Sequence, residues 1–134
     1  MPLFEFEGKR PTIHETAFVA ETASIIGDVT IEENASVWYG VVLRADYGPL
    51  VVALIANGAT VLDGAKVGAR AMVGAGAVVP PGMEIPDDML AVGVPAKVKG
   101  PIPGTPSEIW VKYNPQAYRD LAARYREGVF RLSD

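Results

Sequence analysis

Aliphatic residues recur at every sixth position between residues 13 and 90. Twelve of the thirteen positions reached in steps of six from Ile13 hold Ile, Val or Leu, and the exception is Pro49. Neither a helical period of 3.6 nor the simple alternation of a strand holds one phase over such a length. A six-residue repeat is typical of a parallel β-helix, in which each coil stacks on the one before it. The twelve positions are Ile13, Val19, Ile25, Ile31, Val37, Leu43, Ile55, Val61, Val67, Val73, Val79 and Ile85.

Small residues and turn formers keep the same phase. Alanine dominates four places after each aliphatic position, and Gly, Asn or Asp dominates three places after it. Those three residue types tolerate a positive φ, so they predict a sharp corner between short strands. The predicted fold class is an all-β solenoid of hexapeptide repeats. The predicted corner residues are Gly40, Gly58, Gly64, Gly76, Gly82, Asp28, Asp46, Asp88 and Asn34.

The repeat is interrupted once, at Pro49–Leu54. The phase places Pro49 in the inward position and Val52 at a corner. Proline lacks the N–H that a stacked strand donates, and a β-branched residue resists a positive φ. Residues 47–54 are therefore predicted to form a loop or a distorted coil between two regular blocks.

The two ends of the chain carry different patterns. Residues 3–6 alternate and predict a short lead-in strand that caps the first coil, so that residues 1–100 form the β-helix. Pro and Gly then mark a linker, and residues 101–134 are predicted to form this linker and a C-terminal α-helix. An apolar stripe on that helix predicts packing on the β-helix of its own or a neighbouring chain. The stripe comprises Tyr118, Leu121, Ala122 and Tyr125.

Composition excludes several classes of function. The 134 residues include no cysteine, which excludes disulfides and thiolate metal sites. The formal charge of −4 and the lack of a basic cluster argue against nucleic acid as the partner. No uncharged apolar run is long enough for a membrane span, and the first residues lack a signal-peptide layout. We therefore expect a cytoplasmic protein with no membrane or nucleic-acid partner.

Three motifs together resemble the γ-class carbonic anhydrases and their hexapeptide-repeat relatives. They are Val41–Asp46, Val73–Gly82 and Gly93–Lys97. The resemblance implies a left-handed β-helix that assembles as a homotrimer, with Arg44 and Asp46 at the subunit contact near the metal. The alternative is that Asp46 is only a corner residue and Arg44 a solvated one. Apolar surface for the contact is expected from Trp38, Tyr39, Val41 and Val42.

The family's metal ligands have no counterpart in this sequence. Intact members hold zinc with three histidines between subunits, and the zinc activates water for attack on carbon dioxide. Those histidines would follow the Arg-x-Asp segment, after an Asn-x-Gln-Asp-Gly run that is absent here. About two coils and a loop are missing at the interruption. The single histidine, His14, is expected to be an exposed side chain, so no catalytic residue, metal ligand or cofactor is predicted.

Three functions remain open at this point. The first is a carbonic-anhydrase-like trimer without hydratase activity, because its metal-binding coils are absent. The second is a hexapeptide acyltransferase that uses coenzyme A, which would need a histidine base in a subunit groove. The third is a non-catalytic binding or assembly subunit. The sequence does not identify a substrate for any of them.

Overall fold

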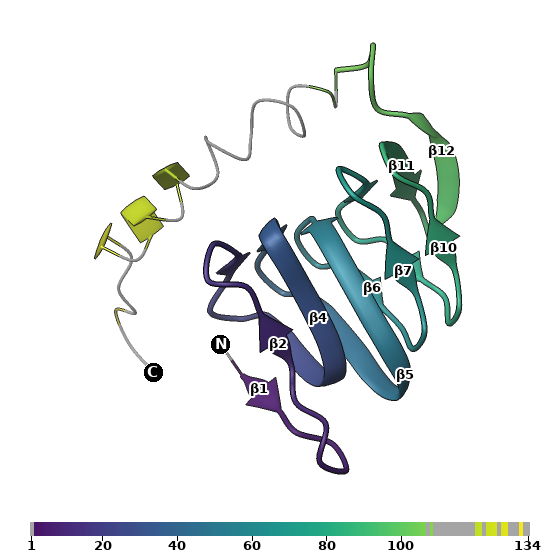
Figure 1. The fold of residues 1–134 in the computed structure, drawn as a ribbon. Helices are drawn as coiled ribbons and strands as arrows, with labels where there is room; N and C mark the ends of the chain where they lie inside the picture. Colours follow the sequence, from purple (N-terminus) through teal and green to yellow (C-terminus); the bar gives the residue numbers. More distant parts are fainter. Residues whose placement is uncertain are drawn as a thin grey trace.

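The chain folds into a left-handed parallel β-solenoid of about five turns, seen in a computed structural model (Figure 1). The structure describes residues 2–106, 108, 120–121, 123–125, 127–128 and 132. The solenoid fold and its handedness confirm the predicted fold class. The strands are β1 (Leu3–Phe4), β2 (Thr12–Ile13), β3 (Phe18–Val19), β4 (Ser24–Val37), β5 (Val42–Ile55), β6 (Thr60–Val61), β7 (Lys66–Val67), β8 (Met72–Val73), β9 (Val78–Val79), β10 (Glu84–Ile85), β11 (Met89–Val92) and β12 (Lys97–Pro101).

Each turn of the solenoid contributes one short stretch to each of three parallel sheets. Face A contains β1, β6, β9 and the first parts of β4 and β5. Face B contains β2, β7, β10 and the middle of the two long strands. Face C contains β3, β8, β11 and the ends of the two long strands. Residues that share a row on one face therefore lie on adjacent, hydrogen-bonded strands.

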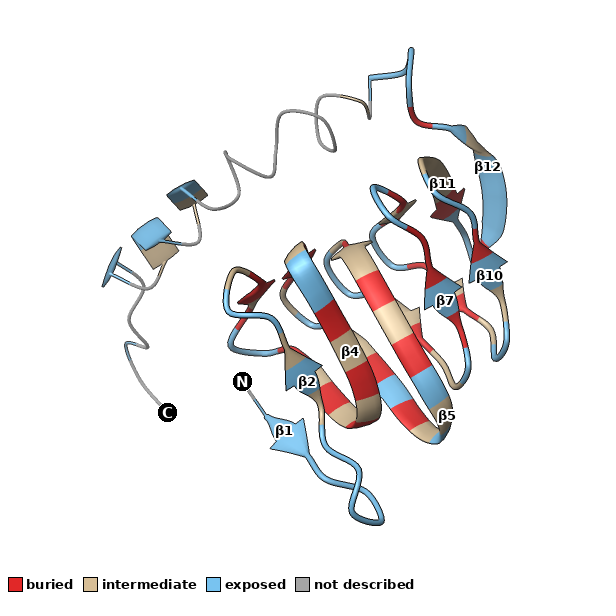
Figure 2. Cartoon of the chain, in the orientation of Figure 1, coloured by how far each residue is buried: buried red, intermediate tan, exposed pale blue. Residues whose placement is uncertain are grey.

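The predicted inward positions form the core. Ten of the twelve aliphatic residues are buried, and the other two, Ile13 and Val19 in the first coil, are half-buried against the core. Figure 2 shows the resulting alternation of buried and less buried residues along β4 and β5. Burial of each such side chain contributes about 1.5–3 kcal/mol before entropy is subtracted. The six-residue phase thus identified the main source of stability.

Most corners also follow the prediction. The five predicted glycines, together with Asn34 and Asp88, have positive φ. Asp28 and Asp46 do not, so their prediction as left-handed corners is wrong; both lie within long strands. Gly27 takes the positive φ instead, and a Cβ there would overlap the carbonyl oxygen of Ala45 on the next coil. Only glycine fits such a close approach.

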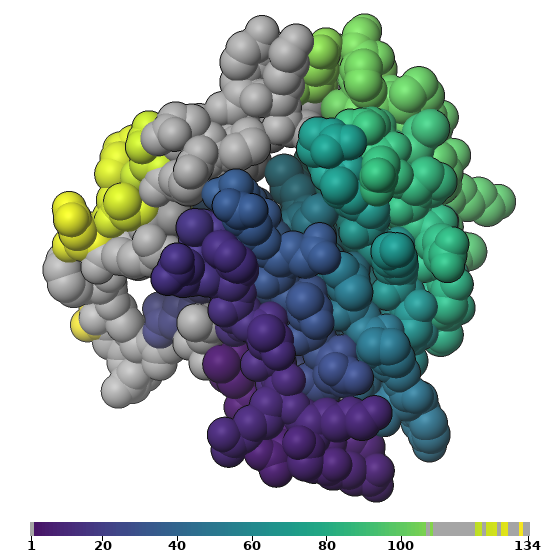
Figure 3. Space-filling view, viewed as in Figure 1, coloured from purple at the N-terminus to yellow at the C-terminus, as the bar shows by residue number. Residues whose placement is uncertain are grey.

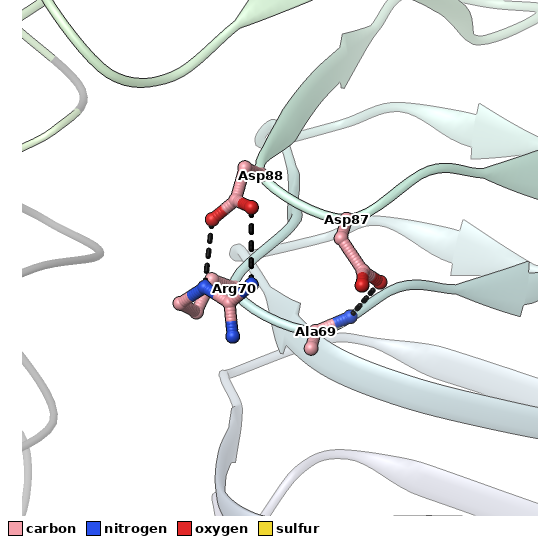
Figure 4. Close-up of polar contacts among 4 residues, drawn as sticks. All are labelled: Ala69, Arg70, Asp87 and Asp88. Atoms are coloured by element: carbon pink, nitrogen blue, oxygen red, sulfur yellow. Dashed lines mark hydrogen bonds and ion pairs between the residues drawn. The ribbon is translucent and has the colours of Figure 1, made fainter.

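One corner uses an arginine where the repeat elsewhere favours glycine. Arg70 has a φ of 57°, and its guanidinium binds both carboxylate oxygens of Asp88, at 2.7 and 3.0 Å (Figure 4). The neighbouring Asp87 accepts a hydrogen bond from the Ala69 amide, at 2.8 Å. These contacts join two successive coils at the same corner. Side-chain bonds between coils therefore stabilise a backbone conformation that a non-glycine residue rarely adopts.

The interruption is a strand with a shifted register. Gly27 pairs with Ala45, but Val29 pairs with Leu50, so three extra residues enter the coil between them. The pairing of Val37 with Ile55 then restores the original spacing. The predicted distortion is thus present, but the predicted loop is wrong because residues 47–54 all lie in β5.

The inward residues of this coil also differ from the prediction. Pro49 is exposed, whereas Leu50 and Val52 are fully buried. Leu50 and Val52 supply the apolar volume that the six-residue phase assigned to Pro49, and the proline ring faces away from the core. Placing Pro49 inward and Val52 at a corner was therefore wrong. Compared with β4, strand β5 gains three residues before Leu50 and omits one corner after Val52. The six-residue phase is therefore restored at Ile55.

The two ends of the solenoid are covered unequally. The predicted N-terminal lead-in strand is present as β1, which pairs with β4 and forms face A of the first coil. Its inward residue, Leu3, stays 45% exposed. At the other end, β12 pairs antiparallel with β11, and Ala96 and Ile102 are buried there. The end near β12 is therefore closed by the chain itself.

The described part of the C-terminal helix packs on the β-helix of its own chain. Residues 120–121, 123–125 and 127–128 are helical, and Leu121 and Tyr125 contact a cluster on the first coils. Tyr125 lies 6.1 Å from Phe18 and 6.2 Å from Trp38 between ring centroids. Figure 1 shows this helix beside the N-terminal coils. Tyr118 and Ala122 lie outside the described residues, and the division of domains at residue 100 stays a prediction.

We predict that Val52 is as important for stability as a regular core residue. Val52→Ala should lower the free energy of unfolding by about 2 kcal/mol, because two fully buried methyl groups are removed. Val61→Ala, at a regular inward position with the same burial, should cost a similar amount. Pro49→Ala should change it by less than about 0.5 kcal/mol. Urea unfolding of the three variants measures this, and a harmless Val52→Ala would contradict the described register.

Candidate functional site

Arg44 and Asp46 lie on the outer surface of face A. Leu43 and Ala45 point inward, so the alternation along β5 directs Arg44 outward. The Arg44 Nε donates a hydrogen bond to Asp46 Oδ2 at 3.0 Å. The Arg44 side chain is 45% exposed and the Asp46 side chain 16% exposed. The hydrogen bond and charge of Asp46 raise the pKa of the Arg44 guanidinium.

Half-buried aliphatic side chains surround this arginine. Val42 lies two residues before it on the same strand, and Ile26 pairs with it from β4. Val61 of β6 pairs with Leu43, so the next residue, Leu62, lies beside Arg44 on the side opposite Ile26. Face A therefore presents a partly apolar surface with one guanidinium at its centre.

Three residues predicted for this surface lie elsewhere. Val41 is fully buried in the core, and Trp38 is buried under the C-terminal helix. Tyr39 also packs against Tyr125 of that helix, with ring centroids 5.8 Å apart. Of the four predicted apolar residues, only Val42 lies beside Arg44. The prediction failed for the others because a corner separates residues 38–41 from face A.

Asp63 joins Arg44 and Asp46 in a polar cluster of three charged side chains. The sequence did not identify Asp63. Its Oδ1 accepts a hydrogen bond from the Tyr47 amide at 2.8 Å, across two successive coils. Burial raises the pKa of the Asp63 carboxyl, but hydrogen bonding, above all from the Tyr47 amide, outweighs burial, so the pKa lies below its ordinary value. Asp46 Oδ1 is buried and accepts no hydrogen bond from the described residues. The register shift in β5 places these residues together, and its extent could not be deduced from the order of residues, so the repeat pattern did not point to Asp63.

His14 lies on face B, away from this cluster. The Thr16 amide donates to His14 Nδ1 at 3.2 Å, and Thr16 Oγ1 lies 2.9 Å from the same nitrogen. Because Nδ1 accepts these bonds, the neutral ring carries its proton on Nε2. A histidine that acts as a general base through Nε2 needs that nitrogen free of a proton. His14 is exposed, as expected.

The described residues do not fit a zinc centre of the carbonic anhydrase type. No group of three or more His, Cys, Asp or Glu side chains among them is placed to hold a metal ion. Asp46 and Asp63 provide carboxylates, but the guanidinium of Arg44 lies beside them and opposes a cation. No reaction step through zinc is therefore derived for this chain. Among the described residues, no helix is long and apolar enough to cross a bilayer.

Known proteins resemble the chain over parts of its length. It is 38% identical over 55 residues to a carbonic anhydrase of Geobacillus kaustophilus, covering 41% of this chain and 30% of that protein. It is 47% identical over 49 residues to the mitochondrial gamma carbonic anhydrase 1 of Arabidopsis thaliana, covering 37% and 18%. No protein-family model matches.

A solved structure matches the fold over nearly the whole chain. The hexapeptide transferase family protein of Anaplasma phagocytophilum superimposes with a TM-score of 0.61 at 27% identity, covering 92% of this chain and 98% of that one. The chain therefore has the hexapeptide-repeat fold and is similar in sequence to γ-class carbonic anhydrases. It spans less than a third of the length of the two carbonic anhydrases above. This hexapeptide-repeat chain therefore shares the scaffold of its relatives.

We predict that Asp63 makes the chain less stable in acid. A folded-state pKa below the ordinary value means that its contribution is present above about pH 4 and is lost as the pH falls through the folded pKa. Asp63→Asn keeps an acceptor for Tyr47 but does not titrate. The stability difference between wild type and this variant should shrink between about pH 5 and pH 2. Urea unfolding across this range measures it, with Glu84→Gln as an exposed control; a constant difference would contradict the assignment.

Proposed function

We propose that the chain is a carbonic-anhydrase-like trimeric scaffold without hydratase activity. The proposal rests on the small number of possible zinc ligands, because the sequence has one histidine and no cysteine. A zinc hydratase needs three protein ligands and an open coordination position. A symmetric trimer would supply three copies of His14, each with Nδ1 engaged by Thr16 of its own chain. The chain keeps the solenoid and the Arg44–Asp46 pair that the resemblance places at a subunit contact.

The trimer is supported by the character of face A. Its half-buried aliphatic residues around Arg44 would lose contact with water if three solenoids packed side by side. Rotational symmetry would cover the same patch in every copy. A guanidinium with a partly buried carboxylate partner suits such a contact because its remaining N–H groups can reach a neighbour. In this proposal the function is assembly or binding of a partner, at a cytoplasmic location.

An acyltransferase is the second candidate, because the superimposed Anaplasma phagocytophilum protein is described as a hexapeptide transferase family protein. Such an enzyme would need a base to remove a proton from the acyl acceptor. His14 is the single histidine, and its Nε2 carries the proton in the neutral ring. This arrangement favours the scaffold over the transferase. Binding of coenzyme A to the purified chain, measured by calorimetry, would favour the transferase over the scaffold.

We predict that the purified chain holds no catalytic zinc. Metal analysis after exposure to zinc or iron and desalting should find far less than one ion per chain, and carbon dioxide hydration should stay at the uncatalysed rate. Zinc should also leave the melting temperature unchanged, because a ligand that does not bind the native state does not stabilise it. Stoichiometric metal together with rapid hydration would overturn the proposal.

We also predict a trimer that depends on Arg44. Light scattering coupled to gel filtration should give three times the mass of one chain at micromolar concentration. Arg44→Ala should raise the dissociation constant at least about tenfold, or about 1.4 kcal/mol, because a charge pair at the contact is broken. Arg70→Ala is the matched control, since it removes an arginine–aspartate pair from a corner outside face A. A monomeric wild type would contradict the assembly, whereas an unaffected Arg44→Ala trimer would contradict only the role of Arg44.

A further inference from the structure

A groove of about 550 Å³ lies on face B at the N-terminal end of the solenoid. Its lining residues are Thr12, His14, Thr30, Ile31, Glu32 and Glu33. Strands β2, β7 and β10 of this face lie in front in Figure 1, and Figure 3 shows the same side as a surface. The groove is separate from the Arg44 cluster on face A, and the proposed scaffold function makes no use of it.

Strand pairing arranges the lining side chains in two rows. Thr12 pairs with Thr30, and Ile13 pairs with Ile31. The isoleucines point toward the core, so the threonines on one side and His14 with Glu32 on the other point outward. The His14 amide donates to the Ile31 carbonyl, which continues the ladder to this second row. The groove therefore has hydroxyls along one side and an imidazole beside a carboxylate along the other.

Local hydrogen bonds fix the chemistry that His14 offers to the groove. The Asn34 amide donates to Thr16 Oγ1 at 2.9 Å, so the Thr16 hydroxyl directs its own hydrogen to His14 Nδ1. The Thr16 amide donates to the same nitrogen. Nε2 of the neutral ring is therefore a hydrogen-bond donor. A metal ion would need a lone pair on Nε2 and is disfavoured here.

The charge of the groove determines which charged group a ligand can carry. Two of its six lining residues are glutamates, and none is lysine or arginine. Both glutamates are exposed and adjacent, so each keeps free acceptor oxygens for a cation. An anionic ligand would be repelled by them. A ligand that satisfies the whole groove has a cationic donor for the glutamates and a neutral acceptor for His14.

We propose that this groove binds small hydroxylated amines of the amino alcohol class. The ammonium group binds the carboxylates of Glu32 and Glu33, and the hydroxyl accepts a hydrogen bond from His14 Nε2. The Thr12 and Thr30 hydroxyls can both donate to and accept from the remaining polar groups of the ligand. Charge-assisted bonds to the glutamates supply most of the affinity, and His14 supplies the preference for a hydroxyl.

Ethanolamine is the probe, in a ¹⁵N-correlated NMR titration of the full chain at neutral pH and constant ionic strength. The expected result is a saturable shift of the amides of residues 12–14 and 30–33 at millimolar concentration. Ethylene glycol, which lacks the charge, and tetramethylammonium, which lacks N–H donors and the hydroxyl, should each bind at least several-fold more weakly. Equal shifts with tetramethylammonium would mean general attraction of cations and would overturn the proposal.

Conservative variants test the proposed roles of the two glutamates and of His14 in binding. Glu32→Gln and Glu33→Gln should each weaken ethanolamine binding at least threefold, while Glu84→Gln on β10 of the same face should leave it unchanged. His14→Ala should reduce the preference for ethanolamine over methylamine, which has no hydroxyl. The amide spectrum of each variant reports whether it is folded. Absence of a saturable shift in the wild type, or full affinity in both glutamine variants, would refute the site.

Discussion

Parallel stacking of successive coils is the constraint on which the rest of this structure depends. Each strand donates and accepts hydrogen bonds with the coil above and below, so inward residues of neighbouring coils must align. Alignment places an aliphatic side chain over an aliphatic side chain throughout the core. Outward residues are aligned by the same register. Rows of side chains on the three faces are therefore a consequence of core packing, and every candidate site in this protein is built from such rows.

The shifted coil shows how much variation stacking tolerates. β5 gains three residues before Leu50 and omits a corner after Val52, yet its pairing with β4 is restored at Val37 and Ile55. Because a solenoid coil contacts mainly its two neighbours, the change stays local. The same property allows coils to be lost in evolution while the remaining ones still stack.

The two polar clusters lie on different faces and have different character. On face A, Arg44 is paired with Asp46 among half-buried aliphatic side chains, which suits contact with another protein surface. On face B, exposed glutamates and a histidine with a fixed proton position surround an open groove, which suits a small cation. Separate faces allow both surfaces to be used at once. A scaffold that assembles through one face would leave the other accessible.

The sequence by itself determined the solenoid, its inward residues and most of its corners. Those features depend on a local period, which the order of residues states directly. It did not reveal the register of β5, because an exposed Pro49 and a buried Val52 are decided by which neighbouring strand each residue pairs with. It also missed Asp63, which lies beside Asp46 only after two coils have stacked. The tertiary structure alone placed Trp38 under the C-terminal helix and Val41 in the core, since contacts between distant segments decide which side of a corner is covered.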